Sequence, residues 1–273
     1  MISSITFEPP SGSAVTLHST VIGTKNVVVR AEGLQGTPSL RELVTNRGQQ
    51  AGAYVRTKYS GPRYVTLDGE IVGSSIEDSF DQFDAISKAF NAAVFAAGTL
   101  KWTRDASGEA LQAGAQLSAL QPLVLTDGSR LLQYSATLIC GDPRVYSQTL
   151  TTGTGNVVTN AGAGNTCSFT NSGSIATPPI IRIYGEITAP VIRLTSGGAG
   201  LIFTSTVAPG DYLEIDVQNR TVKTNGTTNA LSGLNAGASD WFELPTGTGT
   251  VTLTGSSISG SPRADLIYRS AWT

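Results

Sequence analysis

Short segments in which apolar and polar residues alternate run along most of the chain. In residues 14–33, AVTLHSTVIG and KNVVVRAEG are rich in β-branched residues, and each ends at a glycine. This period-two pattern predicts strands with one buried face. Similar segments lie at 54–60, 63–73, 99–105, 115–128 and 131–140. Asp68-Gly69 predicts a tight turn or a bulge, and Asp127-Gly128 predicts a hairpin turn.

One segment has a helical period instead, and we expect a helix over about 75–97. Its apolar stripe consists of Phe80, Phe83, Phe90 and Val94. Ser75 is the expected N-cap, and Gly98 suits the C-terminal stop. Three acids, Glu77, Asp78 and Asp81, follow the cap. We interpret them as charges that favour the positive end of the helix dipole, in preference to a metal site.

The second half of the chain contains only short strand-like segments separated by turn residues. They lie at 179–185, 190–196, 200–206, 211–217, 220–224, 240–244, 250–254 and 264–270. Strands at such regular spacing predict a jelly-roll type of β-sandwich. Residues 148–165 are rich in Gly, Thr and Asn and are expected to be a linker. The predicted organisation is therefore a β-rich domain over 1–147 with one helix, a linker, and a β-sandwich over 166–273.

Composition excludes several classes of protein. Charged residues make up 14% of the chain and the net charge is −2, which argues against a protein that binds nucleic acid by neutralising phosphates. The N-terminus shows no secretion signal, and the apolar run 89–100 is too short to span a bilayer. We expect a protein made in a reducing cytoplasm, without membrane insertion.

Candidate chemistry is sparse. The chain has one histidine, His18, in a strand-like run where a solvent-facing or partly buried position is expected. Cys140 and Cys167 have no zinc spacing and are expected to be buried thiols. No spacing selects a pair of carboxylates for glycoside hydrolysis. We therefore expect no catalytic, metal-binding or cofactor-binding residues and no enzyme activity.

Residues 208–226, APGDYLEIDVQNRTVKTNG, place three acids close together, which could indicate a metal or acid–base site. Leu213, Ile215 and Val217 alternate with Tyr212, Glu214 and Asp216, as in a half-buried strand. A two-residue turn at Gln218-Asn219 would place Glu214 opposite Lys223 on a returning strand. Asp211 belongs to the preceding turn. We interpret these acids as the solvent-facing side of a hairpin.

The order of these features resembles the distal tail proteins of long-tailed, siphovirus-type bacteriophages. In the N-terminal half the resemblance rests on LDGEIVGSSIEDSFDQFDAISKAF and on the Asp-Pro-x-x-Tyr phrase at 142–146. In the C-terminal half it rests on NSGSIATPPIIRIYG, PVIRL, PGDYLEIDVQNRTVKTNG, WFELPTGTGTVTLTG and ADLIYRSAW. One departure is Thr246, which separates Pro245 from Gly247 where the family often has Pro-Gly.

The resemblance implies a structural protein of the virion, at the tip of the phage tail. The N-terminal domain would form a belt, a ring of six subunits, between the tail tube protein and the tail hub or tail-associated protein. DNA would pass through its lumen without specific binding. The C-terminal domain would be a galectin-like sandwich that projects outward and carries receptor-binding or fibre proteins.

A carbohydrate-binding, lectin-like module is the alternative that the residues leave open. Exposed aromatic side chains on the sandwich would support it, and Tyr212, Tyr184 and Trp241 are the candidates. We favour core positions for Trp241 and Tyr184.

Overall fold

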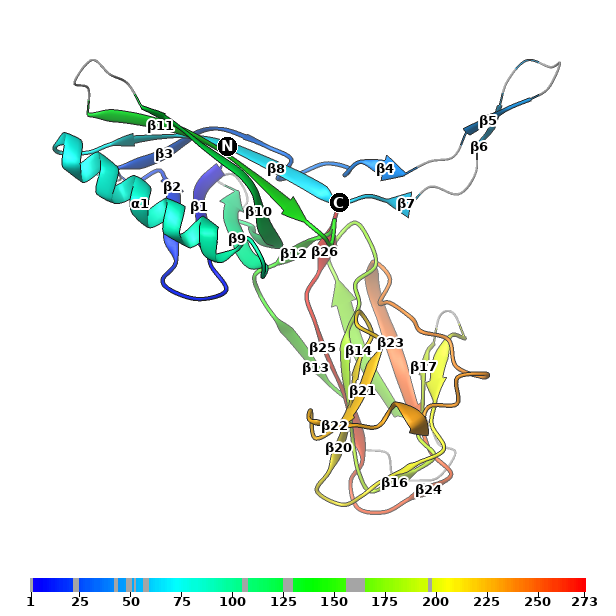
Figure 1. Cartoon of the computed structure of the whole chain (residues 1–273). Coiled ribbons are helices and arrows are strands. Elements are labelled where there is room, and N and C mark those ends of the chain that lie inside the picture. Colours follow the sequence, from blue (N-terminus) through cyan, green and yellow to red (C-terminus); the bar gives the residue numbers. More distant parts are fainter. Residues whose placement is uncertain are drawn as a thin grey trace. The chain divides into compact units, whose positions relative to one another are not determined.

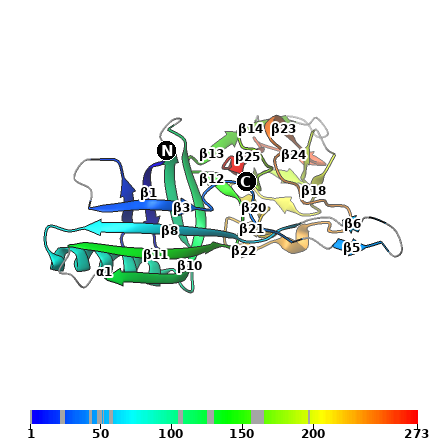
Figure 2. The same ribbon diagram turned by 90° about the horizontal axis from the view of Figure 1, so that it is seen from above.

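The computed structural model divides the chain into two compact units. Unit 1 comprises residues 1–148 with residue 273, and unit 2 comprises 149–272. The structure describes residues 2–21, 25–41, 44–47, 51, 53–55, 59–104, 108–124, 130–155, 165–195 and 198–273. The hairpin predicted at Asp127-Gly128 lies outside these residues. Figures 1 and 2 show the elements of each unit.

Unit 1 is built on an antiparallel sheet with the strand order β2-β1-β9-β10-β11-β8-β3, and β12 also pairs with β10. The strands are β1 (Ile2–Glu8), β2 (Val15–Ser19), β3 (Asn26–Glu32), β8 (Arg63–Val72), β9 (Gly98–Arg104), β10 (Ala110–Val124), β11 (Leu131–Cys140) and β12 (Val145–Ser147). The β8–β11 pairing runs without a break from Arg63 opposite Cys140 to Val72 opposite Leu131. Burial alternates along both strands, as the sequence pattern predicts.

The helix α1 (Ile76–Ala92) packs against β1, β2, β8, β10 and β11. It buries Ser79, Ile86, Ala89 and Phe90, and the rings of Phe90 and Phe7 have centroids 4.9 Å apart. The prediction of a buried stripe is wrong for two of its members, because Phe80 and Val94 are exposed. The buried face is instead centred on Ile86 and Phe90.

The helix is also shorter than the predicted 75–97. The carbonyl of Ala93 accepts a hydrogen bond from the amide of Leu117 in β10 at 3.0 Å. The chain then turns, and Gly98 is the first residue of β9 instead of the helix stop. A Cβ at Gly98 would lie 2.5 Å from the ring of Phe7, so packing requires the glycine there.

Gly69 is in the middle of β8 and not in a turn. The ring of Tyr134 lies where a Cβ of Gly69 would be, 2.3 Å from Cζ. The expected irregularity is a bulge in the neighbouring strand, where the β3 register shifts between Val28 and Arg30, opposite Gly69 and Asp68. The glycine therefore makes room for an aromatic side chain that covers the strand.

A two-stranded ribbon, here called the arm, extends from unit 1 between β3 and β8. It contains β4 (Leu40–Arg41), β5 (Val44–Asn46), β6 (Ala53–Val55) and β7 (Tyr59–Ser60), with β4 paired to β7 and β5 to β6. Figures 1 and 2 show that the arm leaves unit 1 on the side away from α1. A two-stranded ribbon is marginally stable by itself in water, so the arm is a candidate for packing against a partner.

The described residues of unit 2 form two larger sheets and one small sheet. The first has the order β13-β25-β15-β20-β21-β22, the second β14-β23-β17-β18, and the third β19-β16-β24. Their strands are β13 (Thr151–Thr154), β14 (Asn165–Asn171), β15 (Ile180–Tyr184), β16 (Ile187–Thr188), β17 (Val191–Leu194), β18 (Gly200–Ile202), β19 (Thr206–Val207), β20 (Tyr212–Asp216), β21 (Thr221–Thr224), β22 (Thr228–Asn229), β23 (Gly247–Thr254), β24 (Ser257–Ile258) and β25 (Arg263–Tyr268). The last strand, β26 (Ala271–Trp272), belongs to none of these three sheets. A 3₁₀ turn, η1 (Leu231–Gly233), follows β22.

The two larger sheets share one hydrophobic core. Ile181, Ile215 and Leu266 come from the first sheet, and Ile192 and Val251 come from the second. Each set alternates with outward-facing residues, so the unit is a β-sandwich. The prediction of a mainly β chain with one helix is confirmed for the described residues.

Two segments of the second half differ from their predicted structure. Residues 240–244 form no strand; Leu244 makes only an isolated bridge to Thr177, and Phe242 and Leu244 contribute to the core. Part of the segment expected to be a linker, 148–165, is the strand β13, which pairs with β25. Residues 156–164 of that segment lie outside the described residues.

Candidate interaction surfaces

The hairpin at 208–226 has the predicted register. Glu214 lies opposite Lys223, Ile215 opposite Val222 and Asp216 opposite Thr221. Asp216 accepts hydrogen bonds from the amide and the side chain of Asn219, at 2.9 and 2.8 Å, and Asp211 accepts one from Asn225 at 2.8 Å. The positive φ of the first turn is at Arg220 and not at Asn219. These acids act as turn and strand-face residues.

Glu214 forms its ion pair with a residue outside the hairpin. Arg182 Nε donates to Glu214 Oε2 at 2.9 Å from the neighbouring strand β15. This bond with Glu214 raises the pKa of the Arg182 guanidinium. Strand order explains the choice, because Arg182 is cross-strand from both Glu214 and Asp265 and so lies between two carboxylates.

The outer face of the first sheet of unit 2 carries two cross-strand rows, here called the Arg–Tyr face. One row is Asp265, Arg182 and Glu214, and the next is Arg263, Tyr184 and Tyr212. The two tyrosine rings have centroids 5.6 Å apart. Arg263 lies 4.3 Å over Tyr184, and Arg182 lies 5.4 Å over Tyr212. Both ring contacts are within the range of cation–π attraction.

Two of the three aromatic residues suggested for sugar binding are thus brought together, and Tyr184 is not a core residue. Trp241 is partly buried and packs against the sandwich core. Period-two alternation in 180–184 and 263–268 could have shown that Arg182, Arg263 and Asp265 lie on the outward faces of their strands. What the sequence lacked was the neighbour relation of β15 with both β20 and β25, which are distant along the chain.

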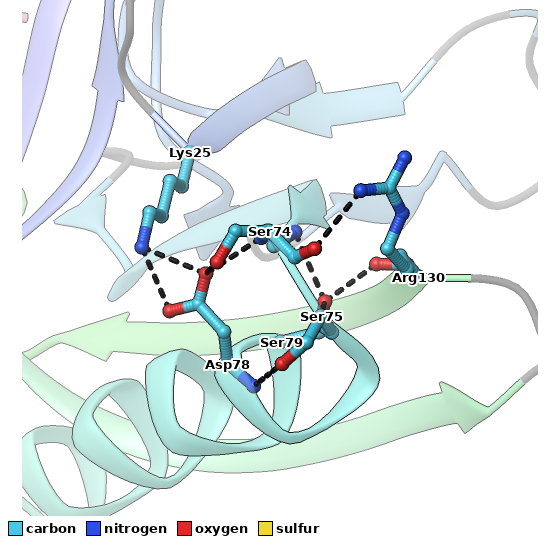
Figure 3. A network of polar contacts seen from close by, with 7 residues as sticks. Lys25, Ser74, Ser75, Asp78, Ser79 and Arg130 are labelled. Carbon is cyan, nitrogen blue, oxygen red and sulfur yellow. Dashed lines mark hydrogen bonds and ion pairs between the residues drawn. The ribbon is translucent and has the colours of Figure 1, made fainter.

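The start of α1 is held by a polar network (Figure 3). Ser75 is the N-cap, as predicted, and its Oγ accepts a hydrogen bond from the amide of Asp78 at 3.2 Å. Asp78 in turn pairs with Lys25 Nζ at 2.7 Å and accepts bonds from the amide and hydroxyl of Ser74. These contacts, led by the bond from Lys25, hold the pKa of the Asp78 carboxyl well below its usual range.

The network also ties α1 to β11 and β8. Ser79 Oγ donates to the carbonyl of Arg130 at 2.5 Å, and Arg130 Nη1 donates to the carbonyl of Ser74 at 2.9 Å. Gly73 follows β8, and its amide donates to Ser79 Oγ at 3.0 Å. Asp78 therefore serves helix capping and docking, which agrees with the interpretation from the sequence, while Glu77 and Asp81 are exposed at the same end of the helix.

The Asp-Pro-x-x-Tyr phrase forms a compact turn at the end of β11. Asp142 accepts hydrogen bonds from the amide of Arg144 at 3.1 Å and from the hydroxyl of Tyr146 at 2.6 Å. Arg63, only 2% exposed, donates to the carbonyl of Pro143 at 2.8 Å and to that of Gly33 at 2.9 Å. Arg63 thus fixes this turn to the segment that leads from β3 into the arm.

One depression of unit 1 lies on the sheet between β3, β8, β10 and β11 and has a volume of about 540 Å³. It contains two carboxylates, and each accepts a hydrogen bond from β11. Ser135 donates to Asp68 and Gln133 donates to Glu70, both at 2.7 Å. Because both acids are engaged in cross-strand bonds, they form a polar ladder and do not converge on a substrate.

Other chemistry-bearing residues are built into the fold. Cys140 and Cys167 are both buried free thiols, and burial raises the pKa of each to about 11. Among the described residues, no group of three His, Cys, Asp or Glu side chains is arranged to hold a metal ion. The described helix is not long and apolar enough to cross a membrane.

Exposed apolar side chains gather in unit 1. Of the fifteen large hydrophobic side chains that are exposed among the described residues, thirteen belong to this unit. They are Val21, Val27, Val29, Leu40, Val44, Tyr54, Tyr59, Tyr64, Val72, Ile76, Phe80, Val94 and Phe95. Phe95 is 95% exposed, in the turn after α1. These exposed side chains are available for contacts with other proteins.

Comparison with known proteins agrees with these features. Residues 172–272 match the family model described as siphovirus-type tail component, C-terminal domain. A search of curated protein sequences gave no match.

Three solved structures share the fold over nearly the whole chain. The Dit protein of phage SPP1, described as a paradigm of the hub adsorption apparatus in phages that infect Gram-positive bacteria, superposes with a TM-score of 0.70 at 14% identity, covering 98% of this chain and 99% of that one. A chain of the phage P2 baseplate activated with Ca gives 0.55 at 11% identity, with 98% of both chains covered. The same baseplate activated with Sr gives 0.53 at 10% identity, with 97% of both covered.

The sequence resemblance to tail proteins is confirmed by this family match and by the shared fold, and with it the virion location. Residues 172–272 thus match the C-terminal domain of siphovirus-type tail components, and nearly the whole chain shares the fold of the Dit protein of phage SPP1.

Proposed function

We propose that the protein forms a homohexameric ring at the tip of the tail, through unit 1, and joins the tail tube to the central hub. One face of the ring would bind the tail tube protein, and the other would bind the tail hub or tail-associated protein. The work of such a protein is assembly, and it requires no catalytic residue.

The observation that carries this proposal is the uneven distribution of exposed apolar side chains. Unit 1 buries Phe7, Phe90 and Trp102 in its core, yet it also holds thirteen of the fifteen large apolar side chains that are exposed among the described residues. A unit that folds well and remains apolar outside is suited to contacts with several neighbours. The arm, which has little core of its own, is suited to the same role.

The ring would enclose a lumen that lets DNA pass without specific binding. A net charge of −2 favours this role, because a basic surface would retain DNA. On the described part of the sheet, the depression is lined by two acids, Asp68 and Glu70, and by one cation, Arg30, so acids are in excess there too. A ring whose lumen repels phosphate would leave DNA free to move.

Unit 2 would be a galectin-like domain that projects from the ring and carries receptor-binding or fibre proteins. Its Arg–Tyr face supports this role. Arg and Tyr are enriched among the residues that dominate binding energy at protein interfaces. The ion pairs and ring contacts also hold the side chains of this face in place before binding, which lowers the entropic cost of association.

Negative-stain electron microscopy of the purified full chain, alone and mixed with the tail tube protein of the same phage, tests the ring. We expect rings with a central hole and six-fold averages in at least the mixed sample. A monomer that stays separate from the tube protein would exclude the proposed role.

One observation favours the alternative of carbohydrate binding, namely the proximity of Tyr184 to Tyr212 on the outer sheet face. However, a guanidinium lies over each ring, which reduces the ring surface left for stacking against a sugar. A glycan array probed with the full chain decides this point. Micromolar binding that Tyr184→Ala abolishes would favour a lectin, and the absence of binding is the expected result.

A further inference from the structure

We propose that the arm of one copy docks on the exposed face of α1 of the next copy, and that this contact makes successive subunits of the ring associate head to tail. The inference rests on the proposed ring and adds the two surfaces that meet in it. The helix surface consists of Ile76, Glu77, Phe80, Asp81 and Asp84. The arm surface consists of Leu40, Arg41, Val44, Arg47, Tyr54 and Tyr59.

The helix surface is acidic with an apolar centre. Ile76 and Phe80 are four residues apart and are each 41% exposed, so they lie side by side on the helix. Glu77, Asp81 and Asp84 are exposed around them. A surface helix usually directs its large apolar residues towards the core, and α1 already does so with Ile86 and Phe90. Ile76 and Phe80 therefore form a second apolar patch that the fold of unit 1 leaves uncovered.

The arm surface has the complementary character. Its described strands expose Leu40, Val44, Tyr54 and Tyr59, which range from 45% to 65% exposed. Arg41 and Arg47 are also exposed. The guanidinium of Arg47 lies 5.0 Å from the centre of the Tyr54 ring, so a cation and an aromatic side chain are presented together.

The two surfaces are at opposite ends of unit 1. In Figure 1 and in Figure 2, the arm extends from the end of the sheet that is remote from α1. An arm can therefore reach the helix of a neighbour while its own helix remains free for the arm of another. Association through two different surfaces is heterologous, and it closes into a ring when the rotation per subunit permits.

Charge selects a second copy as the occupant. The cationic side chains of the arm would face the carboxylates of the helix, and the apolar side chains of both surfaces would be buried together. Opposite charges at the rim of an interface accelerate the encounter and fix the register, while the apolar centre supplies most of the affinity. Docking would also give the two-stranded arm the packing that it lacks in isolation.

Charge reversal with rescue tests the contact. One variant combines Asp81→Arg with Asp84→Arg on the helix, a second combines Arg41→Glu with Arg47→Glu on the arm, and a third carries all four changes. Arg220→Glu, an exposed charge reversal in the turn between β20 and β21 of unit 2, is the matched control. Sedimentation velocity of each full-length protein over a concentration range, at low and moderate salt, gives the concentration for half assembly.

We expect each reversed pair to raise that concentration about tenfold or more and the four-fold variant to restore it substantially. Arg220→Glu should leave it unchanged. Recovery in the combined variant also shows that the reversed proteins fold, because a misfolded unit is not repaired by a second set of reversals.

Three results would overturn the inference, and they separate it from the proposed ring. If wild-type rings form and neither reversal weakens them, the arm–helix contact is wrong and the ring remains. The contact is also wrong if both reversals weaken assembly without rescue, or if the arm reversal blocks only binding of the tube protein. A wild type that forms no ring, alone or with the tube protein, contradicts the proposed function itself.

Discussion

The backbone amide of Val28 donates a hydrogen bond to Nδ1 of His18, with a distance of 3.3 Å between the two nitrogen atoms. Val28 is in β3 and His18 is in β2, the strands at the two ends of the order in unit 1. A second side chain crosses at the same place, where Asn26 donates to the carbonyl of Thr16 at 3.0 Å. The single histidine of the chain thus connects the two edge strands by replacing a backbone acceptor.

Replacing His18 is therefore expected to loosen this junction locally. His18→Leu removes the acceptor and leaves the Val28 amide unpaired in a partly buried position, which costs about 1–3 kcal/mol. Hydrogen–deuterium exchange should show faster exchange at Val28 while α1 stays protected. Thr16→Val alters an exposed side chain of the same strand and should leave the Val28 amide unchanged. Equal protection of Val28 in both variants would exclude a structural role for His18.

Acid should weaken the start of α1 through Asp78. The pKa of this carboxyl is lowered in the folded state, so the folded form releases its proton more readily than the unfolded form, in which an Asp has a pKa of about 3.9. The stabilisation is fully present above about pH 4 and is lost as the pH falls towards the lower folded-state pKa.

Asp78→Asn removes this contribution, so the variant should melt below the wild type at pH 7. The difference between the two melting temperatures should shrink as the pH falls below about 4. Calorimetry of both proteins from pH 7 to pH 3 measures this difference. Asp84→Asn is the control, because it neutralises an exposed acid of the same helix and should give little difference at any pH. A constant difference for Asp78→Asn would contradict the role of the Lys25 ion pair.

The two thiols should be nearly inert in the folded protein. Burial raises the pKa of Cys140 and of Cys167 to about 11, against about 8.5 for a free thiol. At pH 8 the smaller fraction of thiolate by itself makes each cysteine react with a disulfide reagent roughly two hundredfold more slowly than a free thiol. Denaturant should release both thiols, and Ala96→Cys, at an exposed position, should add one fast thiol. Rapid reaction of two thiols in the native wild type would contradict their burial.

Local patterns determined much of what the sequence could predict. Ser75 and its downstream acids define a helix start by chemistry within four residues, and the structure confirms that cap. The register of the 208–226 hairpin was likewise predictable, because a slip by one residue would expose Ile215 and bury Glu214. Both features depend only on residues that are near each other in the chain.

Features that depend on distant residues were not predictable in this way. The Asp68-Gly69 pair predicted a tight turn or a bulge, and only the packing of Tyr134 from β11 explains a glycine in mid-strand. The end of the helix depends on Leu117, whose backbone amide donates a hydrogen bond to the carbonyl of Ala93. The Arg–Tyr face requires β15 to lie between β20 and β25, a neighbour relation that alternation along one strand does not reveal.

The ion pair of Glu214 measures how strongly the placement of β15 beside β20 determines side-chain pairing. The hairpin alone places Lys223 opposite Glu214, yet Glu214 forms its ion pair with Arg182. The guanidinium of Arg182 also lies over the ring of Tyr212 in a cation–π contact. Because Arg182 and Glu214 are partly exposed, their coupling energy should be only about 0.2–1 kcal/mol. A double-mutant cycle with Glu214→Gln and Arg182→Met, followed by denaturant unfolding, measures it, and the parallel cycle with Lys223→Met should give a value near zero. If the Lys223 cycle gave the larger coupling, local pairing within the hairpin would outweigh the placement of β15, and the Arg–Tyr face would lack the rigid ion pair on which its role as a binding surface depends.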